Sequence, residues 1–135
     1  MTREERELVF VELSIRTPYG VYCNIDGDKR LLLGTRREDD DVFASLKYPF
    51  RTGITDKYGV TYRVMEMEIG QWEIRPYLRP LSDMTEEEEI YYNTVFVHKS
   101  PFEKLVWLNS HHFDYRDLIA SGVAIKAEEG MYKFD

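Results

Sequence analysis

The residues best suited to chemistry stand together at His111-His112-Phe113-Asp114. Histidine titrates near neutral pH and ligates metals, so this cluster could form a metal site or an acid–base pair. Adjacent side chains diverge, however, and the HExxH spacing that aims two histidines at one zinc ion is absent. A structural role is favoured, with Asp114 capping a helix, His111 bonding free carbonyls at a helix end and His112 extending a packed face. Any site here would have His98 as its only other histidine.

Two acidic runs could be mistaken for cation sites. Glu86 to Glu89 would spread around a helix, about 100° apart, instead of converging on one ion. Negative charge in a first helical turn stabilises the helix through its dipole. Asp39 to Asp41 lack the glycine and the ligand spacing of a calcium loop. Both runs are therefore predicted to be structural, and we expect no metal and no cofactor.

Arg75, Tyr77 and Arg79 alternate in an extended segment, so their side chains can line one face. Such a stripe could bind a phosphate or carboxylate of a partner, and the favoured alternative is pairing with acids of this chain. Exposed tyrosine and arginine also favour protein-binding hot spots. The predicted partner-binding residues are Arg75, Tyr77, Arg79, His111, His112, Tyr115 and Arg116.

No catalytic residue is predicted. The chain has no Walker loop, GxGxxG, GxSxG, CxxC or deaminase signature. Cys23, the only cysteine, lies in a predicted strand with no base nearby in sequence, which argues against a thiol nucleophile.

The totals limit the class of protein. A chain of 135 residues with 43% hydrophobic residues fits a single domain over residues 1–135 with a real core. No apolar run is long enough to cross a bilayer, and one cysteine suits a reducing cytoplasm. The net charge of −7 argues against direct nucleic-acid binding. The general interpretation of this charge is that it keeps the protein soluble. The more specific interpretation is that it attracts a protein partner with a basic surface.

The predicted elements that position these residues are strands before Leu81 and helices after it. Before it, alternating branched residues predict strands, with a hairpin turn at Asp26-Gly27 and another turn at residues 56–59. Prolines 76 and 80 keep the segment leading to Leu81 extended. The predicted strands are Leu8–Ile15, Val21–Ile25, Leu31–Leu33, Val60–Ile69 and a short one from Trp72, with residues 34–41 as a polar loop and residues 42–50 ambiguous.

After Leu81, signals for a helix start occur three times. Thr85 with Glu88, and Ser100 with Glu103, have the spacing of a capping box. Asp114 is the third predicted cap, for a helix that Gly122 ends. Residues 123–127 are a possible last strand, and residues 128–135 are expected to fray unless Met131, Tyr132 and Phe134 dock. The predicted fold class is α+β: a small bent antiparallel sheet or partial barrel over about residues 8–81, covered by about three short helices within residues 85–122.

Four stretches of the C-terminal half carry a resemblance: residues 76–82 (PYLRPLS), residues 84–88 (MTEEE), Trp107-Leu108-Asn109 continuing through residues 111–116 and 118–119, and Gly130-Met131-Tyr132. They resemble a group of small uncharacterised proteins of Bacteroidetes phages, prophages and mobile elements, over less than half of the chain. That group often has glycine where Asp117 stands. The resemblance implies a mobile-element accessory protein and transfers no functional residue.

Charge and resemblance together predict a non-enzymatic protein-binding accessory protein of a phage or mobile element, located in the cytoplasm. An acidic inhibitor of a host or defence protein is a special case, for example an anti-CRISPR that covers a basic groove with carboxylates. Two alternatives stay open. One is a small metal-assisted hydrolase that uses His111 and His112, and the other is a structural or assembly protein of a virion.

Overall fold

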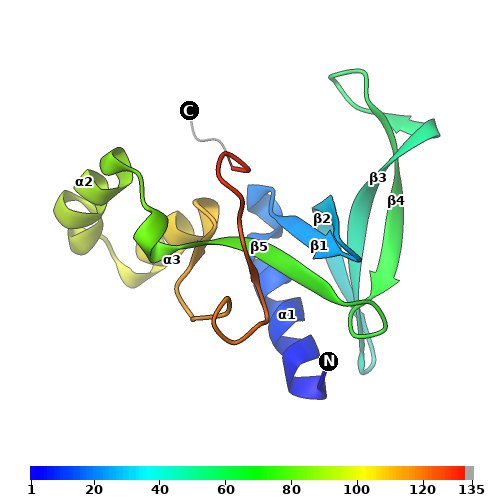
Figure 1. Ribbon diagram of the computed structural model, residues 1–135, viewed down its shortest axis with the longest axis horizontal. Helices are drawn as coiled ribbons and strands as arrows, with labels where there is room; N and C mark the ends of the chain where they lie inside the picture. Colours follow the sequence, from blue (N-terminus) through cyan, green and yellow to red (C-terminus); the bar gives the residue numbers. More distant parts are fainter. Residues whose placement is uncertain (133–135) are drawn as a thin grey trace. The chain divides into compact units, whose positions relative to one another are not determined.

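The computed structural model describes residues 1–132 and contains two compact units, residues 1–76 and residues 77–135. Seven strands are hydrogen-bonded in the order β4-β3-β2-β1-β5-β6, with β7 also paired to β5. The predicted α+β class is confirmed (Figure 1). The sheet is mixed, because β6 and β7 run parallel to β5, and it is open instead of barrel-like, because the described strands at its two ends do not pair with each other. The expectation of one domain stays a prediction.

In the first unit four successive strands form an antiparallel meander, and a fifth returns to pair with the first of them. Its turn at Asp26-Gly27 has positive φ at both residues, 50° and 85°, as a tight hairpin of this twist requires. The buried side chains include Cys23, Leu32 and Leu46. Its elements are α1 (Arg3–Arg16), η1 (Thr17–Tyr19), β1 (Tyr22–Ile25), β2 (Asp28–Glu38), β3 (Asp41–Thr55), β4 (Thr61–Glu68) and the first part of β5 (Ile74–Pro80), which pairs with β1.

The predicted strand Leu8–Ile15 is wrong, because these residues belong to helix α1. Its buried residues, Val9, Glu12, Leu13 and Arg16, recur every three to four positions, whereas Val11 is 40% exposed. Thr2 closes a capping box with the glutamate three positions on, a start signal that the alternation of valines concealed. The helix lies against β2 and β3.

The predicted polar loop over residues 34–41 is also wrong. Strand β2 continues to Glu38, and only Asp39 and Asp40 form the turn. The charged side chains are compatible with a strand because consecutive residues point to opposite faces and each arginine finds a carboxylate on its own face. Arg36 Nη2 donates to Glu66 Oε1 at 2.6 Å, and Arg37 Nη2 donates to Glu7 Oε2 at 2.6 Å.

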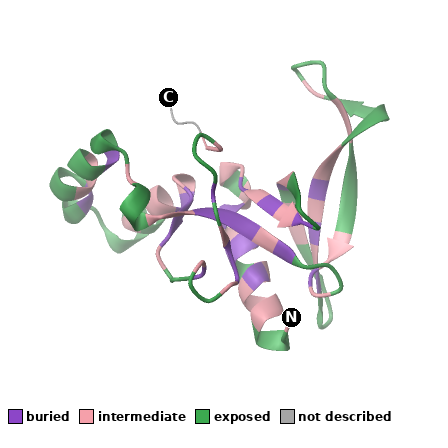
Figure 2. Ribbon diagram, viewed as in Figure 1, coloured by how far each residue is buried: buried purple, intermediate pink, exposed green. Residues whose placement is uncertain are grey.

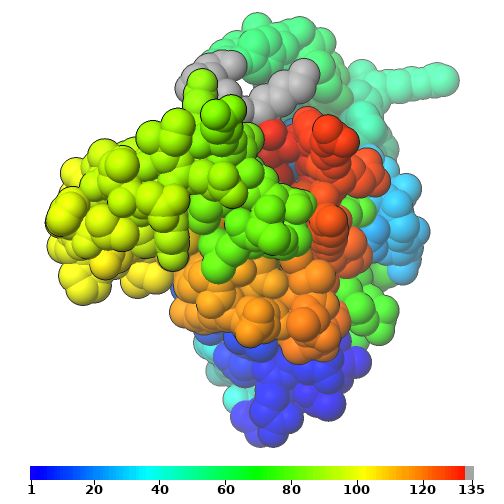
Figure 3. All heavy atoms as spheres, turned by 60° about the vertical axis from the view of Figure 1, so that its left-hand side comes forward, coloured from blue at the N-terminus to red at the C-terminus, as the bar shows by residue number. Residues whose placement is uncertain are grey.

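Consecutive residues at the outer end of the β3–β4 hairpin are exposed, so both faces of this ribbon are open to solvent (Figure 2). In the space-filling view the teal atoms of this segment project as an arm (Figure 3). Pairing jumps from Pro49–Tyr62 to Ile54–Tyr62, so residues 50–53 form a bulge opposite a single residue. Gly53 has a φ of 152°, and a Cβ there would overlap the Tyr62 carbonyl oxygen. Only glycine allows this close approach of the two backbones.

Gly53→Ala is therefore expected to destabilise the hairpin end by about 1–3 kcal/mol, because the bulge must open to admit the methyl group. Gly34→Ala is a matched control, since Gly34 has ordinary φ and nothing within 4 Å of its added Cβ. Amide hydrogen exchange around residue 62 measures the effect. Faster exchange in the Gly53 variant alone is expected, and equal exchange in both variants would contradict the bulge.

The second unit combines the end of β5 with short helices. Both predicted capping boxes are confirmed: Thr85 starts α2 and Ser100 starts α3. Phe96 and Phe113 are among its buried side chains. Its remaining elements are η2 (Leu81–Asp83), α2 (Glu86–Thr94), η3 (Phe96–His98), α3 (Pro101–Ser110), β6 (Phe113–Asp114) and β7 (Ile125–Lys126).

The third predicted helix, after Asp114, is wrong: residues 118–122 form turns. The predicted cap nevertheless accepts backbone hydrogen bonds. Asp114 Oδ1 accepts from the N–H groups of Arg116 (3.2 Å) and Leu118 (3.0 Å), and Oδ2 accepts from Ile119 N–H (2.9 Å). Asp117 has a φ of 56°, a left-handed conformation that breaks a helix and suits glycine.

The segment after β7 docks through Tyr132. Its hydroxyl donates to the Tyr77 carbonyl at 2.8 Å, and its ring stacks on His112 with centroids 3.8 Å apart. Phe134, the other predicted docking aromatic, lies outside the described residues. Within residues 1–132, no helix is long and apolar enough to span a bilayer.

Candidate functional site

The most connected polar cluster in the second unit joins Arg79, Glu88 and His111. The Arg79 guanidinium makes two parallel hydrogen bonds to the Glu88 carboxylate: Nη1 donates to Oε2 at 2.8 Å, and Nη2 donates to Oε1 at 2.5 Å. His111 Nδ1 lies 2.9 Å from Glu88 Oε2. Arg79 also donates to the carbonyls of His111 (3.1 Å) and Asp83 (3.3 Å). One guanidinium thus ties β5 to the end of η2, to the first turn of α2 and to the end of α3.

The same carboxylate closes the capping box of α2. Thr85 N–H donates to Glu88 Oε1 at 2.9 Å, and Glu88 N–H donates to Thr85 Oγ1 at 3.2 Å. Burial alone would raise the pKa of Glu88, but hydrogen bonds from Arg79, Thr85 N–H and His111 lower it to about 2. Glu88 is therefore a fixed anion at neutral pH, unsuited to carrying a proton in a reaction.

An aromatic cluster around Trp107 supports this network. Its ring lies 5.2 Å from that of Tyr91, 4.7 Å from that of His111 and 5.5 Å from that of Phe113, measured between centroids. The Arg79 guanidinium lies 4.4 Å from the Phe113 centroid. The Trp107 ring against His111 and the Phe113 ring against Arg79 thus hold these two polar side chains in one orientation.

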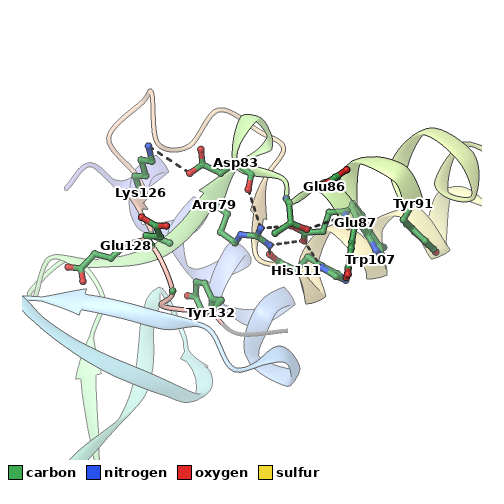
Figure 4. A pocket seen from close by; sticks show the side chains of 15 residues that line it. Arg79, Asp83, Glu86, Glu87, Tyr91, Trp107, His111, Lys126, Glu128 and Tyr132 are labelled. Carbon is green, nitrogen blue, oxygen red and sulfur yellow. Dashed lines mark hydrogen bonds and ion pairs between the residues drawn. The ribbon is translucent and has the colours of Figure 1, made fainter. Parts of the chain in front are cut away.

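These groups form part of the lining of an open pocket of about 1440 Å³ within the second unit. Figure 4 shows Glu86 and Glu87 on one side of Arg79, and Glu128 on the other. The lining holds six carboxylates against two cations, a net charge of −4 with His111 neutral. The exposed carboxylates are those of Asp83, Glu86, Glu87, Glu128 and Glu129, and the aromatic lining is Tyr91, Trp107, His111 and Tyr132.

The predicted partner-binding residues do not form one surface in the structure. Arg79 and His111 line the pocket. His112 is 3% exposed and Tyr77 is 6% exposed, so both are packed inside. Arg75 belongs to the first unit, with Nη2 3.6 Å from Glu73. The favoured alternative of pairing with the chain's own acids therefore applies to both arginines of the stripe.

The two remaining predicted residues lie in the turn that follows β6. Tyr115 donates its hydroxyl to Asn109 Oδ1 at 2.8 Å. Arg116 is exposed, with its guanidinium 5.6 Å from the Tyr115 ring centroid. A role for any of the seven residues in binding a partner stays a prediction.

The paired histidines do not converge. His111 turns toward Glu88, whereas His112, with a φ of 61°, turns its ring onto Tyr132. Among the residues that the structure describes, no three His, Cys, Asp or Glu side chains are grouped as metal ligands would be. Burial raises the pKa of Cys23 to about 12, so its thiol stays protonated at neutral pH.

Sequence reasoning missed two features of the site. Glu88 was assigned only to the helix start, although an arginine nine residues earlier was a possible partner. The acids at 128 and 129 lie about 40 residues from those of α2, and no local pattern joins them. Comparisons with family models, with curated proteins and with solved structures find no match, so no relative assigns a role to any of these residues.

Proposed function

We propose that this chain is a non-enzymatic protein-binding module that holds a basic segment of a partner protein in the acidic pocket of its second unit. The observation that carries the proposal is the lining: six carboxylates and two cations around aromatic rings. Carboxylates attract lysine and arginine, and the rings add cation–π attraction. At about 1440 Å³ the pocket exceeds the usual volume of small-ligand sites and suits a polypeptide segment.

The charge distribution along the chain supports the same proposal. Residues 77–135 contain eleven acidic and six basic residues, a net charge of −5 out of the −7 of the whole chain. An uneven distribution of this kind steers a basic partner toward one unit. The two cations of the lining are already paired, Arg79 with Glu88 and Lys126 with Asp83 at 3.8 Å.

The resemblance to phage and mobile-element proteins extends the proposal. In that context the partner is a host or defence protein whose basic surface handles nucleic acid, and the module acts as its inhibitor by occupying that surface. The hydrolase alternative has no supporting geometry in the described residues, because the two histidine side chains point to different surroundings.

Titration of the full chain with a fluorescein-labelled 12-residue peptide of arginine, lysine and serine tests the proposal. Glu87→Gln with Glu128→Gln removes one carboxylate from each side of the pocket. We expect roughly fivefold weaker binding, from two exposed charge contacts of about 0.5 kcal/mol each.

A matched control changes the net charge equally in the first unit. Asp39→Asn with Asp40→Asn alters two exposed turn residues, and asparagine tolerates the φ of 54° at position 39. The control is expected to bind the peptide within twofold of the unaltered chain. Equal losses in the two double variants would show that net charge alone attracts the peptide, which would refute a pocket.

A further inference from the structure

The outer half of the β3–β4 hairpin has a charge opposite to that of the chain. Residues 47–63 contain four cationic side chains and one acidic side chain, a net charge of +3, while the rest of the chain has −10. This excess lies on a two-stranded ribbon whose end is exposed on both faces. The net charge of the whole protein therefore conceals a local basic surface.

The single acid of this segment is already engaged. Lys47 Nζ lies 2.9 Å from Asp56 Oδ2, and Asp56 Oδ1 accepts the backbone N–H groups of Tyr58 and Val60 at 2.9 and 3.0 Å. The remaining cations are Arg51, Lys57 and Arg63. Within residues 1–132, none of these three has a carboxylate within ion-pair distance.

Several arginines outside the ribbon, in contrast, do have acidic partners. Arg36, Arg37 and Arg79 each make a forked or double contact with carboxylates. Arg63 instead donates to Thr52, with Nε to the carbonyl at 3.1 Å and Nη2 to Oγ1 at 3.1 Å. These neutral partners position the guanidinium without cancelling its charge.

Exposed aromatic rings accompany the cations. Tyr58 is 78% exposed and Phe50 is 45% exposed. Lys57 Nζ lies 5.1 Å from the Tyr58 ring centroid, and the Arg63 guanidinium lies 4.8 Å from that of Phe50. The bulge at residues 50–53 holds Phe50 and Arg51 out of the strand pairing. Rings this exposed contribute little to a core and are accessible to a ligand.

We propose that the outer end of the β3–β4 hairpin binds single-stranded nucleic acid. The three cations would contact successive phosphates, and the exposed rings would stack on unpaired bases, the combination by which single strands are held without base-specific contacts. An acidic protein segment would match the charge but offers no series of flat π-faces for the rings. This inference is independent of the acidic pocket and rests on residues of the first unit alone.

Fluorescence anisotropy of the full chain with a labelled 12-nucleotide oligothymidylate at 50 mM salt tests the inference, with the RNA counterpart and a 12-base-pair duplex as further probes. Three phosphate contacts predict a slope of about −2 for log affinity against log salt, or roughly 20-fold weaker binding at 200 mM. Arg51→Gln with Lys57→Gln is expected to reduce the slope to about −0.7. Tyr58→Ala is expected to weaken binding about tenfold.

Lys29→Gln with Lys99→Gln is the matched control, because it makes the same charge change at two exposed positions outside residues 47–63. This control should bind like the unaltered chain. No binding at 50 mM salt, equal losses in the two double variants, or competition by polyglutamate as strong as by unlabelled oligonucleotide would overturn the inference. Duplex binding that matches the single strands and ignores Tyr58→Ala would overturn the single-strand assignment.

Discussion

Replacing Glu88 by glutamine is expected to lower the free energy of unfolding by about 3 kcal/mol, since it leaves the Arg79 guanidinium without its counter-charge. The Arg79 and Glu88 side chains are 12% and 8% exposed, so water replaces the lost contact poorly. Urea denaturation at pH 7, followed by tryptophan fluorescence, measures the change.

Glu103→Gln is a matched control. Glu103 occupies the same position in the capping box of α3, but it is 54% exposed and faces Lys99 across 3.5 Å. Its replacement is expected to cost less than about 1 kcal/mol. Equal destabilisation by the two substitutions would mean that the Arg79 network adds nothing beyond a helix cap.

The pH dependence of the Glu88 effect has a definite sign. The folded pKa of Glu88, about 2, lies below its ordinary value of 4.5. The unfolded chain therefore takes up the proton first as pH falls, and the contribution of about 3 kcal/mol is present above pH 4.5 and lost toward pH 2. The stability difference between the unaltered chain and Glu88→Gln should shrink across this window. If this stability difference stays constant from pH 6 to pH 2.5, the lowered pKa of Glu88 in the folded protein is contradicted.

Asp114→Ala is expected to destabilise the second unit by about 3 kcal/mol, because three backbone N–H groups lose their acceptor and one of the three is buried. The Asp114 residue is 8% exposed, and the Leu118 N–H that it holds is buried. Asp114→Asn removes the negative charge of the side chain but keeps its shape, so it shows how much of the effect depends on charge. Asparagine can keep the Oδ1 contacts to Arg116 and Leu118 and lose only the Oδ2 contact to Ile119.

Urea denaturation of both variants checks this prediction. The asparagine variant should lie between the unaltered chain and the alanine variant. A loss below about 1 kcal/mol in Asp114→Ala would show that the turn holds without its carboxylate.

The sequence correctly predicted those helix starts and turns that depend only on neighbouring residues. The capping boxes at Thr85 and Ser100 and the hairpin at Asp26-Gly27 depend on residues within three positions of one another, and all three are confirmed. Helix α1 was mistaken for a strand because Val9, Val11 and Leu13 alternate at period two, while the burial that decides the matter comes from contact with β2 and β3.

The candidate site could be predicted only in part for the same reason. Arg79 and His111 were named from residue type, but what joins them is Glu88, 23 residues before His111. Net charge also leaves out one local feature, because an average of −7 hides the basic end of the β3–β4 hairpin. Features that depend on pairings between distant segments need the fold before they can be recognised.

The chain provides its own reporter for the central claim, the binding of a basic segment in the acidic pocket. It contains two tryptophans: Trp107 lines the pocket, whereas Trp72 lies in the first unit. Their indole N–H signals in a ¹⁵N–¹H correlation spectrum can be followed while the basic peptide is added. The account predicts that the Trp107 signal shifts in a saturable way and that the Trp72 signal stays in place. A shift of Trp72 alone, or no shift of Trp107 at saturating peptide, would contradict it.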